Sequence, residues 1–491
     1  MTTSSLHRGL WASLGIAGAA LAVGLGACGD TAGSAATPDT IDASTGASDG
    51  GVQGDGAAGS GDSSTPDAIA DAGPFVPASA RAELVFSSPA RTKTPPAWNA
   101  HSPKLVGDGT FFYAVHTYFT DPVDTRFAAI LRRSAGAAIG SGTWSEVARV
   151  QTPHQPPGIV MDTAKQMHMV FDCLRPDTVD VTCFPGGAGT GGLTSHFYHL
   201  VFAARDVAGA LRFDTYGNAN EWSAESNGYT GIGTTSDGLT YWSLASTAWQ
   251  RVVAWSSAGG SGTAATLDTP GEYLLYPIHA ASPLLGSKEL VLYAGNFDPT
   301  GGNNASYLAS TAYAGDRNGL TQLFRRAPAV AMPGAIGAFP SDIAFAADGT
   351  LYALSYLAGT TGHCTELLRF DGGIGTPPTI LPVGCVSDYA KLQLSRSGVL
   401  YLVTGGASGA NVKLGISADR GASWTWQTIP IAGLPANGDV SYDGFTPVKP
   451  YTSPTIFDPD RFVFFFYGAD ATGGVANSYV GEIDLAAAQG H

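Results

Sequence analysis

The chain contains little charge and few basic side chains. Asp, Glu, Lys and Arg make up 13% of its 491 residues, and Lys and Arg number 25 against 40 Asp and Glu. Soluble domains usually contain about twice this share of charged residues, and coiled coils contain more. Nucleic-acid binding needs a basic surface. The composition therefore argues against a helical bundle, a coiled coil or a nucleic-acid partner.

Several motifs that mark catalytic and cofactor sites are also absent. The sequence has no Gly-rich phosphate loop, no nucleophile elbow and no Asp-rich calcium loop. Its five Cys residues contain no Cys-x-x-Cys spacing, which is typical of structural zinc sites. We therefore predict neither a metal nor a cofactor.

Long apolar runs are rare as well, and the one that stands out lies near the start. It extends from Leu10 to Leu25, after Arg8, and is followed by Gly-Ala and Cys28. A positive residue, a short apolar run and small residues are typical of a secretory signal. The segment resembles a bacterial lipobox, which implies that residues 1–27 are a lipoprotein signal peptide and that Cys28 is lipidated. An ordinary signal peptide or a single membrane helix is the alternative.

The segment that follows is poor in large apolar side chains. Residues 29–74 contain eight Asp and no Lys, Arg or Glu, within a background of Gly, Ala, Ser and Thr. Such a composition cannot bury enough apolar surface to offset chain entropy. We predict a disordered tether over residues 28–75 and a folded domain over residues 76–491. Lipoproteins with Gly29 after the lipidated Cys usually reach the outer membrane of Gram-negative bacteria, so we expect an exported protein, lipid-anchored at the outer membrane or cell surface.

The remaining four Cys residues form two pairs that are local in sequence. Cys173 and Cys183 are ten residues apart, and Cys364 and Cys385 are 21 residues apart. In an oxidising compartment this pattern favours two disulfides, each closing a short loop.

The sequence is rich in Gly (65 residues) and in aromatic side chains (10%). Both favour many short strands joined by tight turns. A unit of apolar strand, tight turn and apolar-aromatic strand recurs at intervals of 49 to 73 residues, beginning at Ser102, Pro156, Tyr229, Ala281, Pro340, Tyr389 and Ser453. Asp-Gly, Ser-Gly and Gly-Ser at the turns favour short hairpins.

Further strand pairs lie between these units, for example from Phe127, Tyr198 and Asn411. Each unit thus supplies about four antiparallel strands, which is the blade of a β-propeller. We predict an all-β fold, a seven-bladed β-propeller. The last unit lacks a fourth strand, and the stretch from Ala82 could supply it and close the ring. Two β-sandwiches are the alternative.

One motif resembles a known family. Ser417, Asp419, Gly421 and Trp424 match the Asp-box, or BNR repeat, of sialidase-like β-propellers. The resemblance implies that Asp419 ties a hairpin turn, that Gly421 permits it, and that Trp424 packs between sheets. These roles are structural and do not indicate an activity.

In propellers, the loop leading into the innermost strand of each blade lies on the face that commonly binds ligands. Here these loops carry rings that suit a sugar, whose faces are apolar and whose rim is polar. The alternative is that these rings pack the joints between blades. We predict a binding surface made by His101, Tyr229, His279, Tyr389 and Tyr451, together with His154 and Phe339.

Three functions remain open. A sialidase needs an Arg cluster and a Tyr nucleophile paired with Glu, but residues 91–96 lack the expected Arg-Ile-Pro. The ulvan lyases, which are BNR-type propellers, remove a proton beside a uronate carboxylate; His154, His196, Tyr198 and Arg205 are the candidates for this chemistry. The third function is non-catalytic binding of an extracellular glycan or a surface protein, by a protein that we expect to be a monomer. We predict glycan binding, with cleavage or a protein-binding scaffold as alternatives.

Overall fold

The structure is a computed structural model of the chain. It describes residues 78–87, 102–120, 125–151, 157–176, 193–202, 204–205, 211–212, 215–216, 222–223, 231–245, 250–256, 265–269, 274–284, 290–297, 307–316, 319–326, 335–359, 362–371, 376–385, 390–405, 411–434, 439–469 and 476–489. The chain divides into two compact units, Met1–Ala70 and Asp71–His491. All described residues belong to the second unit, so the predicted signal peptide, Cys28 and the tether lie outside them.

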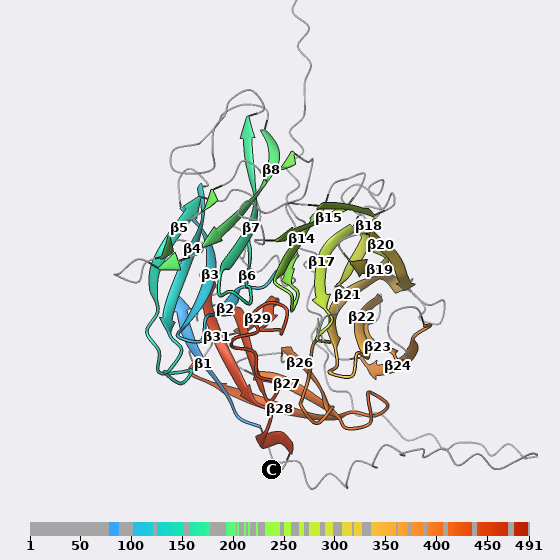
Figure 1. Cartoon of the computed structure of the whole chain (residues 1–491). Coiled ribbons are helices and arrows are strands. Elements are labelled where there is room, and N and C mark those ends of the chain that lie inside the picture. The colour runs from blue at the N-terminus through green and yellow to red at the C-terminus, as the bar shows by residue number, and fades with distance from the viewer. Residues whose placement is uncertain are drawn as a thin grey trace, which may run out of the picture. The chain divides into compact units, whose positions relative to one another are not determined.

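The second unit is built from antiparallel sheets that follow one another along the chain (Figure 1). Four sheets have four strands each, in sequence order. Their strands are β2 (Leu105–Gly107), β3 (Phe111–Thr120), β4 (Thr125–Ser134) and β5 (Ser145–Gln151); β13 (Ile232–Thr234), β14 (Leu239–Ala245), β15 (Gln250–Ser256) and β16 (Ala265–Thr269); β17 (Leu274–Ala281), β18 (Leu290–Phe297), β19 (Tyr307–Asp316) and β20 (Gly319–Arg326); and β21 (Ala335–Phe345), β22 (Leu351–Gly359), β23 (Gly362–Phe370) and β24 (Thr379–Gly384).

The sheet between β5 and β13 is less regular. Its main strands are β6 (Gly158–Met161), β7 (Met167–Pro176) and β8 (Leu193–Phe202). Four two-residue strands follow, namely β9 (Ala204–Arg205), β10 (Leu211–Arg212), β11 (Thr215–Tyr216) and β12 (Trp222–Ser223). β11 and β12 pair with β8, whereas β9 and β10 pair with each other. The strand pair predicted from Tyr198 is thus present only in fragments.

The last sheet has eight strands, because two sets of four join through β1 (Ala80–Phe86). β1 pairs antiparallel with β31 along one edge and parallel with β28 at Ala80 and Arg81. The other strands are β25 (Lys391–Leu394), β26 (Leu400–Gly405), β27 (Asn411–Ser417), β28 (Thr425–Ala432), β29 (Asp439–Pro447), β30 (Arg461–Ala469) and β31 (Ala476–Asp484), and the 3-10 helix η3 (Ala487–Gln489) follows. The prediction of an all-β fold is confirmed.

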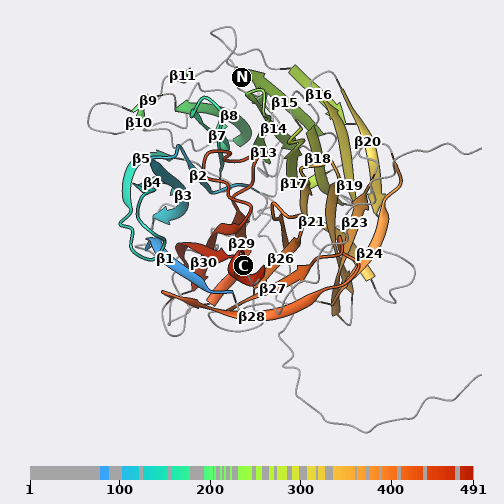
Figure 2. The same ribbon diagram turned by 60° about the horizontal axis from the view of Figure 1, so that its bottom comes forward.

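The first strands of successive sheets lie side by side. β2 contacts β6, β6 contacts β13, β13 contacts β17, β17 contacts β21, and β21 contacts β25. Figure 2 shows the sheets following one another around a common centre. This order brings residues from distant parts of the sequence together at that centre.

The hydrophobic cores lie between neighbouring sheets. One cluster joins Val106 and Tyr113 of the β2–β5 sheet to Ile159 and Met169 of the next sheet. Another joins Leu354 of β22 to Leu402 of β26. Because each sheet buries apolar side chains against its neighbours, stability depends on contacts between sheets as well as within them.

The predicted turn chemistry is confirmed in four hairpins between first and second strands. Each has Gly at a backbone φ between 82° and 87°, a conformation that side chains with a Cβ seldom adopt. These residues are Gly109, Gly238, Gly349 and Gly398, three of them in Asp-Gly pairs and the last in Ser-Gly.

The last predicted unit is wrong in one respect. Residues 453–457, expected to form its first strand, adopt turns, and the first strand is β29, which ends at Pro447. The apolar pattern was misleading because Ser453 accepts a hydrogen bond from Gly107 of β2, and Ile456 and Phe457 pack against a core cluster instead of pairing in a ladder.

The predicted disulfide between Cys364 and Cys385 is present and links β23 to the residue after β24. Cys173 lies in β7, but its side chain and Cys183 lie outside the described residues, so that disulfide stays a prediction.

Within the described part of the chain, no helix has the length and apolar character needed to cross a membrane.

Candidate functional site

A short segment after β29 connects several sheets at the centre. Thr234 N, at the end of β13, donates a hydrogen bond to the carbonyl oxygen of Tyr451 (2.7 Å). Met161 N, at the end of β6, donates to the carbonyl oxygen of Thr452 (2.8 Å). Gly107 N of β2 donates to Ser453 Oγ (3.0 Å). We call residues 449–453 the central segment.

The side chains of the central segment extend to two further sheets. Lys449 Nζ forms an ion pair with Asp342 Oδ2 of β21 (2.7 Å) and donates a hydrogen bond to the carbonyl oxygen of Leu392 in β25. The Tyr451 hydroxyl donates to the carbonyl oxygen of Ile343 (3.2 Å). The central segment therefore holds together sheets that start as far apart as Leu105 and Lys391.

Asp342 is the acceptor around which this network is arranged. Its Oδ2 also accepts the backbone N–H of Leu392 (2.7 Å), and its Oδ1 accepts its own neighbour's N–H, from Ile343 (2.9 Å). A buried carboxylate is tolerable only when it is paired and hydrogen-bonded in this way. Asp342 and Lys449 are thus primarily structural.

Within the described part of the chain, Lys391 forms fewer hydrogen bonds than Lys449. Its ammonium donates to the carbonyl oxygen of Ser341 (2.8 Å), and the side chain is buried. Burial lowers its pKa to about 8, while Asp342 acts in the opposite direction and Lys449 adds to the lowering. The group is therefore mostly charged at pH 7 and supplies a neutral amine slightly above that pH.

His279, in β17, is buried beside these groups. Its Nε2 lies 3.0 Å from Ser243 Oγ, and its ring meets the edge of Tyr241 at 5.0 Å between centroids. Burial lowers its pKa to about 3, so the imidazole is neutral at pH 7. Its Nδ1 has no hydrogen-bond partner among the described residues.

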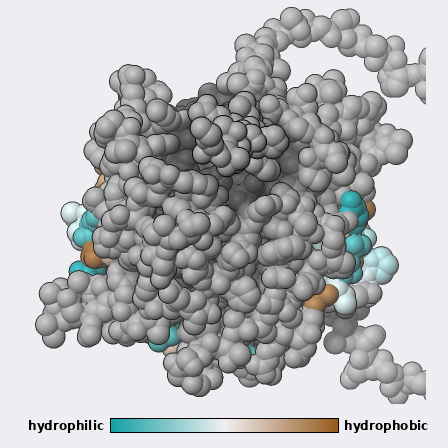
Figure 3. Space-filling model, turned by 90° about the horizontal axis from the view of Figure 1, so that it is seen from above, coloured by the Kyte–Doolittle hydropathy of each residue, from teal (hydrophilic) through white to brown (hydrophobic). Residues whose placement is uncertain are grey.

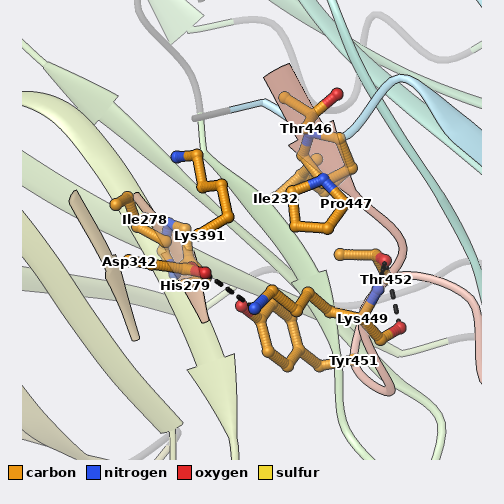
Figure 4. A pocket seen from close by; sticks show the side chains of 11 residues that line it. Ile232, Ile278, His279, Asp342, Lys391, Thr446, Pro447, Lys449, Tyr451 and Thr452 are labelled. Carbon is orange, nitrogen blue, oxygen red and sulfur yellow. Dashed lines mark hydrogen bonds and ion pairs between the residues drawn. The ribbon is translucent and has the colours of Figure 1, made fainter. Parts of the chain in front are cut away.

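These residues line one cavity of about 30 Å³ (Figure 4). Figure 4 shows Lys449 and Asp342 pointing toward each other beside Tyr451. Thr446 also lines the cavity, and its buried hydroxyl has no partner in the part of the chain that the structure describes. A cavity of this size holds about two water molecules. We therefore expect water, or one small polar group of a ligand, to satisfy Lys391, His279 and Thr446.

The structure places three of the predicted binding residues. His279 and Phe339 lie within first strands, β17 and β21, and not in the segments before them. Tyr451 follows β29, and its hydroxyl is bonded inside the protein. His279 and Tyr451 line the same cavity, whereas Phe339 packs on Tyr356. As ligand-binding residues they remain predictions.

The structure does not describe the side chains of the other predicted site residues. His101, His154, Tyr229 and Tyr389 lie outside the described residues. His196 and Tyr198 are in β8 and Arg205 is in β9, but only their backbones are described. The proposed catalytic set therefore stays a prediction.

Residues 417–424, which resemble an Asp-box, form the turn between β27 and β28. Asp419 Oδ1 accepts hydrogen bonds from Ser417 Oγ (2.7 Å) and from Ser423 N (2.9 Å). Gly421 N donates to Ser417 Oγ (2.8 Å), and Gly421 has a φ of 93°. Trp424 packs against a core cluster between β21–β24 and β25–β28. Each residue has a local structural role, and none lines the cavity.

Sequence reasoning did not identify Lys391, Lys449 or Asp342. A signal was available for two buried lysines, since Lys104 and Lys391 each precede apolar residues at the start of a short first strand, in a chain with few Lys. No sequence pattern indicated that Lys449 and Asp342, 107 residues apart, would meet. Among the described residues, no group of three or more His, Cys, Asp or Glu could hold a metal ion.

Comparison with known proteins gives a fold and no family. No protein-family model matches the chain, and no curated protein matches it either. Among solved structures, the polysaccharide lyase Uly1 superposes with a TM-score of 0.50 and 9% identity, over 84% of this chain and 100% of the lyase. An α-L-arabinanase from Penicillium chrysogenum (TM-score 0.40, 12% identity, 83% of this chain and 98% of that one) and the NanB sialidase from Streptococcus pneumoniae (0.40, 12%, 84% and 71%) are also similar. The likeness to the lyase shows a shared β-propeller type of fold and nothing about the activity of this chain.

Proposed function

We propose that the described unit is a seven-bladed β-propeller whose ring is closed by β1. The sheets beginning with β2, β6, β13, β17 and β21 supply five blades, and the eight-stranded sheet supplies two, β25–β28 and β29–β31 with β1. The antiparallel pairing of β1 with β31 supports closure. Deleting residues 78–87 should then lower stability strongly while removing only one strand; a midpoint of urea unfolding that hardly moves would contradict closure.

We propose that this propeller recognises extracellular carbohydrate at its centre. The observation that carries the proposal is a pair of buried groups in the cavity lining, His279 Nδ1 and Thr446 Oγ1, which have no hydrogen-bond partner among the described residues and share that lining with Lys391. Two lysines, Lys391 and Lys449, and one carboxylate, Asp342, line the cavity, so the local charge is positive. Buried groups of this kind favour an oxygen-rich, acidic ligand group. A sugar ring is larger than the cavity, so only one of its groups would enter it.

A polysaccharide-lyase activity is the second candidate. The observation that favours it is Lys391, because a base with a pKa of about 8 is suited to proton transfer near neutral pH. Lys449 would not serve as the neutralising cation, since it is committed to Asp342. The shared fold with the polysaccharide lyase Uly1 is consistent with this reading.

One experiment separates binding from cleavage. Purified protein is titrated calorimetrically with oligosaccharides of uronic acids and of sialic acid, and parallel samples are followed by ultraviolet absorbance of unsaturated products. We expect Lys391→Met to weaken uronate binding at least tenfold, and Lys413→Met, on β27, to leave it unchanged. Binding without new absorbance supports a recognition module, and new absorbance that is lost in Lys391→Met supports the lyase. Absence of both rejects this site.

We also propose that the protein is exported and held at the membrane through lipid on Cys28, as the lipobox-like sequence indicates. Cys28→Ser should release it from the membrane fraction of cells that express it. Retention of the variant in that fraction would contradict the anchor. A surface protein remains the alternative ligand to a glycan, and a monomer remains the expected state.

A further inference from the structure

A second candidate site lies at the edge of the propeller, away from the central segment. A groove of about 440 Å³ separates β1 from the β4–β5 hairpin, and Figures 1 and 2 show these strands next to each other. Its size is within the range of small-molecule sites, about 300–1,000 Å³. Leu84, Phe86, Thr143, Trp144 and Glu146 are among the residues that line it.

A β-bulge in β1 gives the groove its apolar wall. Leu84 pairs with Tyr479 and Phe86 pairs with Ser478, so Val85 is the extra residue. Alternation in a regular strand would put Phe86 on the face of Leu84, but the bulge moves it to the face of Glu83. There Phe86 packs on His116 of β3, at 4.5 Å between ring centroids. Leu84 stays on the other face of β1, where it is 47% exposed, and it also belongs to the groove lining.

A buried carboxylate fixes the opposite wall. Glu83 Oε1 accepts a hydrogen bond from Trp144 Nε1 (2.9 Å) and forms an ion pair with Arg133 Nε (2.5 Å). Glu83 Oε2 accepts the backbone N–H groups of Gly140 and Gly142 (2.8 and 3.1 Å). The indole and the loop that bears it are therefore held in place before any ligand binds. A rigid aromatic surface costs little entropy when a ligand stacks on it.

The polar groups of the groove indicate the chemistry of the ligand. Glu146 is the one ionisable residue among those that line it, and Thr143 and Ser87 add hydroxyl groups. A carboxylate accepts hydrogen bonds from sugar hydroxyls and repels anionic sugars. In the view from above (Figure 3), hydrophilic and hydrophobic described residues are interspersed at the periphery of the unit.

A peptide strand that pairs with β1 fits the groove less well than a sugar does. β1 is paired with β31 along one edge, and β28 pairs with the start of its other edge. Glu83, on the same strand, binds the loop at residues 140–142. Little of the backbone of β1 is left to form a ladder with a further strand.

We propose that this groove is a binding site for an uncharged sugar, with one pyranose ring stacked on Trp144 and its hydroxyls bonded to Glu146. A pyranose with equatorial hydroxyls has an apolar C–H face that matches an indole. The site is separate from the central cavity and does not depend on the function proposed for it.

Cellohexaose is the probe, and calorimetric titration is the measurement. We expect the wild-type protein to bind it, Trp144→Ala and Glu146→Ala each to weaken binding at least fivefold, and Lys413→Met, on β27, to bind as the wild type does. Ile380→Ser is the matched control for Leu84→Ser, because both side chains are exposed apolar residues on strands. Leu84→Ser should weaken binding and Ile380→Ser should not.

Two results would overturn the proposal. One is no heat of binding for cellohexaose with the wild-type protein, and the other is equal binding by Glu146→Ala and wild type. If Trp144→Ala fails to fold, Trp144→Phe and Glu146→Ala decide the matter, since Glu146 is on the surface. The charge argument has its own test: an oligoglucuronate should not compete with cellohexaose in the wild type, and competition by it would contradict the role of Glu146.

Discussion

Two buried ion pairs, one at the centre of the propeller and one at its edge, have similar chemistry and different surroundings. Asp342–Lys449 and Glu83–Arg133 each join separate sheets, and each carboxylate also accepts two backbone N–H groups. Beside the first lies a cavity of about 30 Å³, and beside the second a groove of about 440 Å³. The ion pair fixes the sheets in both places. Backbone of the central segment lies next to the Asp342–Lys449 pair and leaves little room for a ligand. The side chain of Trp144 lies next to the Glu83–Arg133 pair, and the space beside it is larger.

The largest effect should come from breaking the central pair. Lys449→Met leaves the Asp342 carboxylate buried without its cation, so the free energy of unfolding should fall by about 3–5 kcal/mol. Urea denaturation measures this loss. The control is Lys413→Met on β27, which should change stability by less than about 0.5 kcal/mol. Equal midpoints for the two variants would show that the central segment does not hold the sheets.

Removing one charge from the Glu83–Arg133 pair should lower the free energy of unfolding less than removing one from the Asp342–Lys449 pair. Glu83→Gln keeps the shape of the side chain, and Arg133 still interacts with the carboxylate of Glu482, so the variant should cost only about 2 kcal/mol. The same denaturation experiment applies. Glu146→Gln, in the same region but exposed, should stay within about 0.5 kcal/mol of the wild type. A loss at Glu83 as large as that at Lys449 would remove the distinction between centre and edge.

The pH dependence of the free energy of unfolding should show that the pKa of Lys391 is lowered in the folded protein. Its pKa is about 8 in the folded protein and 10.5 as an ordinary lysine, so between these values the unfolded chain binds more protons. The free energy of unfolding should therefore rise with pH from about 8 to 10.5, because the buried ammonium loses its charge. The quantity to compare is the slope for wild type minus the slope for Lys391→Met. Parallel curves would mean that Lys391 is not buried as a cation.

The smallest effect concerns the water expected in the central cavity. Thr446→Val removes a buried hydroxyl, and if that hydroxyl binds water in the cavity the loss should be about 1 kcal/mol. Thr143→Val, on the exposed loop of the groove, should be neutral. Stabilisation by Thr446→Val would mean that the cavity is dry and that the hydroxyl is truly unpaired.

Local features of the fold could be predicted from the sequence. The Asp-Gly turns at Gly109, Gly238 and Gly349 depend on the conformation of single residues, and the Cys364–Cys385 disulfide joins neighbours along the chain. The hydrogen bonds of Asp419 are likewise made within five residues. Apolar alternation failed at residues 453–457, which form turns: Ser453 bonds to β2, and Ile456 and Phe457 pack against a core cluster.

The candidate sites were less predictable, because they depend on contacts between distant residues. Asp342 and Lys449 meet across 107 residues, and Glu83 and Trp144 across 61. The rings expected to surround the channel were chosen by their position before predicted strands. His279 and Phe339 instead lie inside strands, since β17 and β21 begin earlier than the apolar pattern indicated.

The sequence by itself determined that this chain forms many short antiparallel strands with glycine turns, because strand alternation and turn conformation are properties of neighbouring residues. Only the tertiary structure decided where charge is buried. A lysine or glutamate is tolerated in the interior when a partner from another sheet pays its desolvation cost, and that partner is known only once the sheets are assembled around their common centre.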